Sequence, residues 1–330
     1  MNRTSNFAAV AALSLIVCSA REAGAQLETG PDTVMVKSGQ LTLRGLLWRP
    51  TGAGPFPGVL FNHGSGSTAD PVSMEDASTI GRLFARHGYV FLFLFRQGMG
   101  LSRGQGTADG DLMARAFAAE GVAGRNRVQL ELLEGEELGE ATAGLGFLRN
   151  LPKIDPKRVA VVGHSFGGSL TLVLAARDTT IRAAVAFGPA AASWEPSPRL
   201  RARLLGAVDH VAAPVMFIHA ANDYSVEPGE ALAAEMQRRK KVRVLKIYPS
   251  FGATAREGHN LVYLNVSAWE RDVFGFLDDA VDRRNGGRSH KDTGLIRRVT
   301  HQGKPHPLSL PPLLRSPDPL HRSTAPPLHR

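Results

Sequence analysis

Residues 158–168 read Arg-Val-Ala-Val-Val-Gly-His-Ser-Phe-Gly-Gly, and the interpretation of the whole chain starts from them. Residues 159–162 form a short apolar and mostly β-branched run without polar alternation, which is typical of a strand buried on both faces of a parallel sheet. Residues 163–167 match Gly-x-Ser-x-Gly, a pattern in which the serine occupies a sharp turn between a strand and a helix. The apolar residues 168–177 predict that helix. Because strand, serine turn and helix follow in this order, Ser165 is a candidate nucleophile.

Two later loops contain the residue types that would activate this serine. A serine hydroxyl needs a general base within hydrogen-bond reach, and the base needs an acid that fixes its tautomer. Asp223 follows the strand expected at 214–219, and His259 follows the strand expected at 242–248. The order Ser…Asp…His is the one found with this type of strand-to-helix turn. We therefore predict a triad of Ser165, Asp223 and His259.

Other polar residues fit these roles less well. His219 lies at a strand end and Asp209-His210 at the end of an expected helix, so they are only alternatives for the base. Asp178 comes too soon after the serine helix to be the acid. Tyr224, next to the predicted acid, is interpreted as a packing residue, with a place in the substrate pocket as the alternative.

The negative charge that develops on an attacked carbonyl oxygen needs N–H donors that are already in place. One expected donor is the backbone N–H of Phe166, directly after the candidate nucleophile. The other is expected in the glycine-containing loop 62–67, which follows an early strand. Within this loop the Ser65 N–H is favoured, with the Gly64 N–H as the alternative. The side chain of His63 is interpreted as structural.

Apolar runs alternate with amphipathic stretches along the rest of the chain. Strands are expected at 33–37 and 41–48 as a hairpin, and then at 56–61, 89–95, 183–187, 214–219 and 242–248. Helices are expected at 74–87, 199–208, 230–239 and 261–283, and residues 111–150 are mostly helical in composition, most strongly over 126–148. This alternation predicts an α/β fold with a mostly parallel central sheet and helices on both faces.

Two groups of residues in the first half of the chain invite a ligand-binding interpretation. Glycines follow residues 89–95 at the spacing Gly-x-Gly-x-x-x-Gly, without a well-placed acidic residue for a ribose, so a dinucleotide site is not expected. Five glutamates of the predicted helix are interpreted as a solvated face rather than a metal cluster: Glu131, Glu134, Glu136, Glu137 and Glu140. We expect neither a metal nor an organic cofactor.

Residues 1–25 have the features of a secretory signal peptide. Arg3 is followed by an apolar run at 7–17, and Ala23-Gly24-Ala25 supplies small residues for cleavage. The apolar run is shorter than the roughly 20 residues that span a bilayer, so we expect a secreted or periplasmic protein cleaved near Ala25, without a stable membrane anchor. Cys18 lies in this segment after Val17, a poor fit to a lipidation site. The mature chain then contains no cysteine for a disulfide, a nucleophile or a thiolate metal site.

The net charge of +9 is concentrated in residues 283–330. This segment holds 10 of the 39 Lys and Arg and 2 of the 30 Asp and Glu, which leaves 29 basic and 28 acidic residues before it. A nearly neutral main domain at 26–282 gives no reason to expect a nucleic-acid partner. The proline-rich, histidine-rich composition of the segment predicts a disordered, solvated tail. Weak contact with anionic surfaces and metal binding through its histidines are the alternatives.

Four segments together resemble the α/β-hydrolase superfamily and, more narrowly, its dienelactone-hydrolase-like branch. They are Phe61-Asn62-His63-Gly64, Gly163-His164-Ser165-Phe166-Gly167-Gly168, His219 with Asn222-Asp223 and Val226, and Gly258-His259. The similarity spans residues 34–282 and implies the α/β-hydrolase fold. Only 26 residues separate Phe187 from Pro214, so we expect little or no lid over the site.

Dienelactone hydrolases proper use a cysteine nucleophile, whereas this chain has Ser165 at that position. The resemblance therefore implies a serine hydrolase that cleaves carboxylic esters or lactones of small soluble substrates through an acyl-enzyme. A thioesterase or a small peptidase with the same triad is an alternative within the enzymes. A non-catalytic binding module on the same fold is the alternative from another class. The sequence does not predict the oligomeric state.

Overall fold

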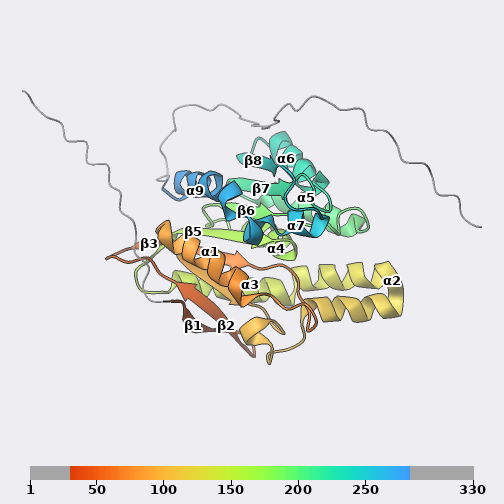
Figure 1. Ribbon diagram of the computed structural model, residues 1–330, viewed down its shortest axis with the longest axis horizontal. Helices are drawn as coiled ribbons and strands as arrows, with labels where there is room; N and C mark the ends of the chain where they lie inside the picture. Colours follow the sequence, from red (N-terminus) through yellow and green to blue (C-terminus); the bar gives the residue numbers. More distant parts are fainter. Residues whose placement is uncertain (1–29, 283–330) are drawn as a thin grey trace, which may run out of the picture. The chain divides into compact units, whose positions relative to one another are not determined.

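Eight strands form a single sheet within residues 30–282, the part of the chain that the computed structural model describes (Figure 1). They are β1 (Asp32–Ser38), β2 (Leu41–Trp48), β3 (Phe56–Asn62), β4 (Val90–Phe95), β5 (Ile154–His164), β6 (Ala184–Phe187), β7 (Val215–Ala220) and β8 (Arg243–Tyr248). Their order across the sheet is β1-β2-β4-β3-β5-β6-β7-β8. β1 and β2 form the predicted antiparallel hairpin, β2 pairs antiparallel with β4, and all other neighbours are parallel. The mostly parallel sheet is therefore confirmed.

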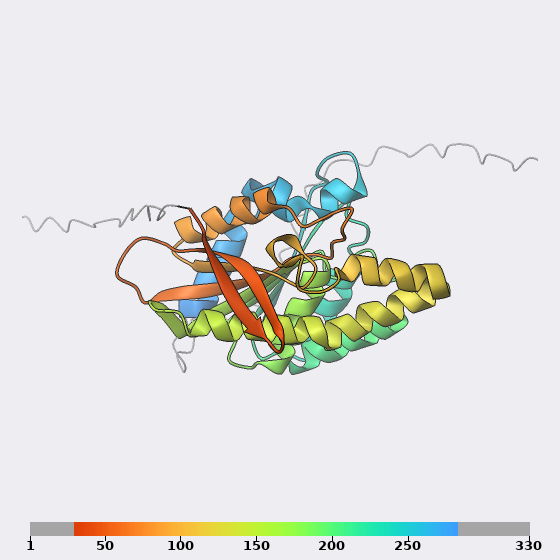
Figure 2. The same ribbon diagram turned by 90° about the horizontal axis from the view of Figure 1, so that it is seen from below.

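Helices cover both faces of the sheet, as predicted. One face packs against α2 (Asp109–Glu134), α3 (Glu136–Arg149), α4 (Phe166–Arg177), α5 (Pro198–His210) and α6 (Glu227–Arg238), and the other against α1 (Met74–Arg86), α8 (Leu261–Leu264) and α9 (Val266–Asp282). Figure 2 shows α1 and α9 on one side of the sheet and α3 on the other. The helix expected at 261–283 is thus two helices, α8 and α9.

Alternate residues of β4 supply the apolar layers on both faces of the sheet. Val90, Leu92 and Leu94 belong to one buried layer, and Phe91, Phe93 and Phe95 belong to the other. Because side chains of a strand point alternately to opposite faces, a strand in this position must be apolar at every residue. Each fully buried side chain of this size stabilises the fold by about 1.5–3 kcal/mol.

The helix α2 consists of two arms that lie side by side (Figures 1 and 2). The chain reverses at Gly121, whose φ of 64° and ψ of −152° are not helical and are readily adopted only by glycine. A second break at Gly135 separates α2 from α3. The single strong helix expected over 126–148 is therefore divided between two helices. The prediction missed this break because the residues on both sides of Gly135 have a helical composition, and one glycine alone does not show that a helix ends.

Two of the five glutamates that were expected on a solvated face are buried. Glu137 is 0% exposed and Glu140 is 1% exposed, and they face Arg96, which is 2% exposed. The prediction was wrong for these two residues because charge spacing along a helix does not reveal a counter-charge supplied by a different strand. Among residues 30–282, no group of three or more His, Cys, Asp and Glu side chains is placed to hold a metal ion.

The predicted signal peptide at 1–25 and the predicted tail at 283–330 lie outside the described residues. Of the predicted domain at 26–282, the structure describes Gly30 onward. Within 30–282, no helix combines the length and apolar composition needed to cross a membrane.

Candidate active site

Ser165 occupies the turn between β5 and α4 in a conformation that is unusual for a residue with a side chain. Its φ is 56° and its ψ is −118°, so the turn holds backbone strain at this position. The flanking glycines make room for it. A Cβ atom on Gly163 would lie 2.2 Å from the Gly167 carbonyl oxygen, and one on Gly167 would lie 2.0 Å from the Asn62 carbonyl oxygen. The motif therefore needs glycine at both positions for close backbone packing.

The structure brings Ser165, His259 and Asp223 together at the carboxyl edge of the sheet. The distance from Ser165 Oγ to His259 Nε2 is 2.9 Å, and the distance from His259 Nδ1 to Asp223 Oδ1 is 2.7 Å. The three side chains come from the ends of β5, β7 and the loop after β8, where α7 (Ala255–His259) carries the histidine. This arrangement holds an Nδ1–H on His259 against the carboxylate and leaves Nε2 to accept the serine proton.

Asp223 is held in its ionised form. Burial raises the pKa of its carboxyl group, but hydrogen bonds from His219 and His259 outweigh burial and keep the pKa well below its usual range. The backbone N–H of Tyr224 also donates to Asp223 Oδ1 at 2.7 Å. The carboxylate is therefore a fixed negative charge that can stabilise a positively charged His259.

His164, directly before Ser165, connects the serine turn to the histidine loop. Burial and the nearby His259 lower its pKa to about 3, so its imidazole is neutral at ordinary pH. Its Nε2–H donates to the backbone carbonyl of His259 at 2.9 Å. The sequence motif places no requirement on this position, and the link to His259 could not be predicted because it spans 95 residues of chain.

The loop after β3 lies directly against the nucleophile. A Cβ atom on Gly64 would lie 3.4 Å from Ser165 Cβ. Arg96 donates to the carbonyl oxygens of His63 at 2.8 Å and of Gly64 at 3.0 Å. In a trans peptide the N–H points opposite to the carbonyl, so the N–H groups of Gly64 and Ser65 point away from Arg96. Since both residues line the cleft beside Ser165, both N–H groups stay candidates for the oxyanion donor that acts with Phe166 N–H, and Ser65 N–H remains the predicted one.

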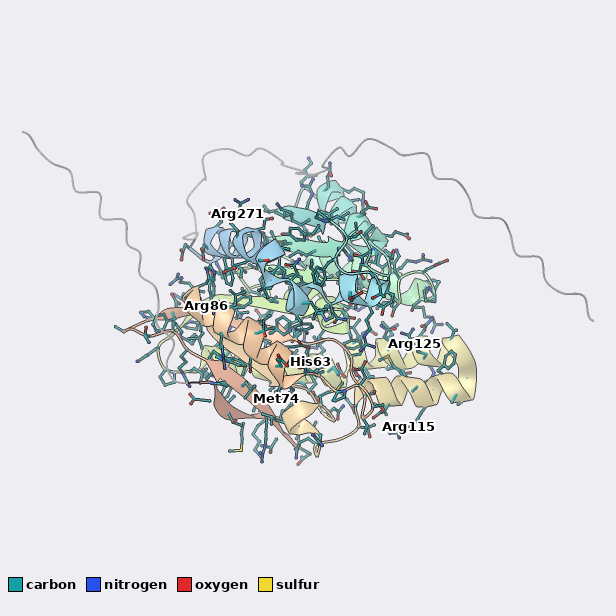
Figure 3. The ribbon with its side chains drawn as sticks, in the orientation of Figure 1. His63, Met74, Arg86, Arg115, Arg125 and Arg271 are labelled. Carbon is teal, nitrogen blue, oxygen red and sulfur yellow. The ribbon has the colours of Figure 1, made fainter. Side chains whose placement is uncertain are left out.

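His63 has a structural role in this loop, as expected. Burial and the charge of Arg96 hold its pKa well below the ordinary value, so the ring is neutral. Nδ1–H donates to the Gly64 carbonyl at 2.7 Å, and Nε2 accepts from the Arg96 backbone N–H at 3.1 Å. Figure 3 shows His63 within the body of the molecule beside α1. The ring therefore couples the loop to the end of β4.

Arg96 anchors residues 62–67, the loop after β3 that we call the oxyanion loop, from a buried cluster of charges behind it. Its Nε lies 2.5 Å from Glu137 Oε2, and Nη2 lies 3.3 Å from Asp109 Oδ2. Asp109 in turn accepts from the Gly66 N–H at 3.0 Å. Sequence reasoning missed these residues, although Arg96 directly follows the apolar run of β4 and so had to lie at the carboxyl edge of the sheet.

Glu140 completes this cluster, and its burial makes the ionised form of its carboxyl group unfavourable. Burial raises its pKa from 4.5 to about 7, and the pKa of Glu137 is likewise raised well above its ordinary value by burial. Glu140 Oε2 accepts from the Gln97 N–H at 3.0 Å. Three carboxyl groups thus share one arginine, which favours a protonated member.

The raised pKa of Glu140 has a predictable effect on stability. Between pH 4.5 and about 7 the folded chain retains a proton that the unfolded chain has lost, so Glu140 lowers the free energy of unfolding as pH rises through this window. Glu140→Gln keeps an oxygen for the Gln97 N–H and removes the charge. We expect the variant to gain roughly 1–3 kcal/mol relative to wild type between pH 5 and pH 8, measured by urea unfolding. Glu131→Gln, on the exposed side of α2, is the control, and an equal change in both variants would contradict the prediction.

A cleft of about 480 Å³ opens onto the triad. Its wall includes Gly64, Ser65, Ser165, Tyr224, His259 and Tyr263. Tyr224 is 49% exposed, and its ring centre lies 5.0 Å from that of His259, so it lines the pocket and is not a packing residue as first interpreted. A larger depression of about 1040 Å³ lies between Arg149 and Asp282, but it contains no triad residue. The smaller cleft is therefore the candidate substrate site.

In the part of the chain that the structure describes, none of the alternative residues Asp209, Asp178 and His219 contacts Ser165. Asp209 pairs with Arg239 at 2.5 Å, and Asp178 pairs with Arg149 at 2.5 Å. His219 lies within the site, but its Nδ1 contacts Asp223 Oδ2 at 2.8 Å and not the serine. It is therefore a second partner of the acid rather than the base.

A serine on a strand-to-helix turn, with an aspartate and a histidine on the loops after two later strands of a mostly parallel sheet, defines an α/β-hydrolase. Residues 43–278 match the family model described as the dienelactone hydrolase family. Since this match covers most of the chain, the chain belongs to the dienelactone hydrolase family. The expected resemblance is confirmed.

Three individual proteins similar to this chain share between 18% and 28% of the aligned residues with it. The polyketide transferase grgF of a Penicillium species is 28% identical over 203 residues, which cover 59% of this chain and 59% of that protein. This chain thus spans less than two thirds of that curated relative. A dienelactone hydrolase-like promiscuous phosphotriesterase from metagenomic libraries superposes with a TM-score of 0.54 at 19% identity, over 76% of this chain and 98% of that chain. The acylaminoacyl peptidase of Pyrococcus horikoshii has a TM-score of 0.57 at 18% identity, over 80% of this chain and 44% of that chain. These structural likenesses establish the fold alone.

Proposed function

We propose that the protein is a serine hydrolase that cleaves carboxylic esters or lactones of small soluble substrates. The observation that carries the proposal is the continuous hydrogen-bonded chain from Ser165 through His259 to Asp223 at the wall of an open cleft. Membership of the dienelactone hydrolase family supports the same chemistry. The reaction then needs only the side chains of this site, two backbone N–H groups and water.

The proposed cycle has two halves. Ser165 Oγ attacks the ester carbonyl while His259 Nε2 takes its proton, and the alkoxide leaves with that proton as the acyl-enzyme forms. Water then attacks the acyl carbonyl, with His259 again as base, and Ser165 leaves with the proton. In both halves the N–H groups of Phe166 and Ser65 donate to the carbonyl oxygen as it becomes negative. Asp223 stabilises the imidazolium that exists between the two proton transfers.

The shape of the cleft favours small substrates. The segment between β6 and β7 is occupied largely by α5, whose Leu200 and Leu204 are buried in the core. Of this segment, only Ala192 lines the cleft. The rim instead holds an exposed ion pair between Arg256 and Asp70 at 2.9 Å. A short, polar-rimmed cleft offers little apolar surface to a long acyl chain.

We therefore expect kcat/KM to stay within about threefold from p-nitrophenyl butyrate to p-nitrophenyl palmitate, because methylenes beyond the cleft gain no burial. Initial rates over a series of chain lengths, below the aggregation limit of each ester, provide the measurement. A rate that rises steadily toward the long esters would contradict the proposed substrate size. Thioester and peptide substrates in the same series test whether the ester is the preferred bond.

A further inference from the structure

Asp223 is held by two histidines, one on each carboxylate oxygen. His259 Nδ1 contacts Oδ1 at 2.7 Å, and His219 Nδ1 contacts Oδ2 at 2.8 Å. The proposed mechanism uses only the first of these contacts. His219 comes from the end of β7, four residues before Asp223, and its backbone is fixed by the parallel ladder with β8, where it pairs with Ile247.

The His219 ring is enclosed and has no access to the substrate. The residue is 2% exposed, and it is absent from the wall of the cleft. Within the described chain, its Nε2 has no hydrogen-bond partner. A Cβ atom on Gly229 of α6 would lie 2.6 Å from this nitrogen, so the space for the ring depends on a glycine there. Leu245 of β8 packs at the same place.

These contacts determine which tautomer the ring uses. Asp223 is ionised and accepts only, so the contact at 2.8 Å requires a proton on His219 Nδ1. The neutral ring with its proton on Nδ1 makes this hydrogen bond and leaves Nε2 bare against Gly229 and Leu245. His219 therefore acts as a fixed hydrogen-bond donor to the acid, and its other ring atoms provide the packing that holds it there.

We propose that His219 is a positioning residue of the triad, which fixes the Asp223 carboxylate through Oδ2 so that Oδ1 faces His259. This inference rests on the proposed function and adds a fourth member to its catalytic apparatus. Without the His219 donor, Oδ2 would be a buried charged oxygen lacking its hydrogen bond, and the carboxylate would turn toward other donors. The Tyr224 N–H and His259 Nδ1–H, which both now bind Oδ1, would then be shared between two oxygens.

Loss of His219 should therefore slow the reaction, because a misplaced Asp223 carboxylate stabilises the positively charged His259 less well.

The test measures the rate at which a fluorophosphonate labels Ser165, because this rate depends on the triad and not on the identity of the substrate. His219→Leu removes the donor and keeps similar bulk. His219→Asn places an amide N–H near the position of Nδ1 and keeps the donor. We expect His219→Leu to label about 10–100 times more slowly than wild type. His219→Asn should label within about threefold of wild type.

Circular dichroism and thermal unfolding first establish that each variant is folded. If His219→Leu does not fold, His219→Gln replaces it, since its amide N–H lies near the position of Nε2 and away from Asp223. A folded donor-less variant that labels at the wild-type rate, or a His219→Asn variant as slow as the donor-less one, would overturn the inference. The proposed function fails separately, if Ser165→Ala protein is still labelled.

Discussion

Ser165→Ala is expected to lower kcat/KM for p-nitrophenyl butyrate by a factor on the order of 10⁴ or more. The hydroxyl at 2.9 Å from His259 Nε2 is the atom that forms the acyl-enzyme, and alanine supplies no nucleophile. What activity remains would come from water attack assisted by the N–H donors and the bound geometry. Alanine keeps the Cβ atom, so the backbone strain at φ 56° is the same in the variant as in wild type. We therefore expect the fold to be retained.

Steady-state kinetics of wild type and variant, with labelling by a fluorophosphonate probe, check this expectation. Ser267→Ala is the matched control. Its hydroxyl binds Asn265 Oδ1 at the start of α9 and lies outside the cleft, so activity should stay within about twofold. If the Ser165→Ala protein turned over substrate at a rate near wild type, the assignment of the nucleophile and with it the proposed mechanism would be wrong.

Arg96→Met is expected to have the largest effect on stability, a loss of about 3–5 kcal/mol in the free energy of unfolding. The side chain is 2% exposed, and its removal leaves the carboxyl groups of Glu137 and Asp109 buried without a counter-charge. The carbonyls of His63 and Gly64 also lose their donors, so the oxyanion loop should lose its orientation. We therefore expect kcat to fall as well, even at temperatures where the variant is folded.

Urea unfolding at pH 7 measures the change, and Arg86→Met provides the comparison. Arg86 is exposed in the last turn of α1, as Figure 3 shows, where it interacts favourably with the helix end. Its replacement should cost at most about 1 kcal/mol. Similar losses for the two variants would mean that the buried cluster does not need its arginine, and the role we give Arg96 in the loop would have to be abandoned.

The turn at Ser165 could be predicted from the sequence because its determinants are local. Gly163 is required by the Gly167 carbonyl within the turn, and the apolar residues of β5 are required by burial on both faces. Asp223 and His259 could be proposed for a related reason. Parallel strands end at one edge of a sheet, so loops that follow β7 and β8 had to lie near the end of β5.

The partners of these residues could not be predicted in the same way. His219 was considered as an alternative base, yet it binds Asp223 Oδ2, and the choice depends on the direction in which the ring leaves the end of β7. His164 binds the His259 carbonyl across 95 residues of chain. Glu137 and Glu140 follow a pattern of charges that fits an exposed helix face, and only their proximity to Arg96 makes them buried.

Local composition and the order of elements were thus sufficient for the α/β class, the serine turn and the members of the triad, because steric requirements and strand burial act on neighbouring residues. The folded chain alone decided which donors hold the acid, which carbonyls turn toward Arg96 and which glutamates are buried. These properties depend on directions and distances between side chains on different strands and helices. Such distances arise only when the sheet and its two helical layers pack together.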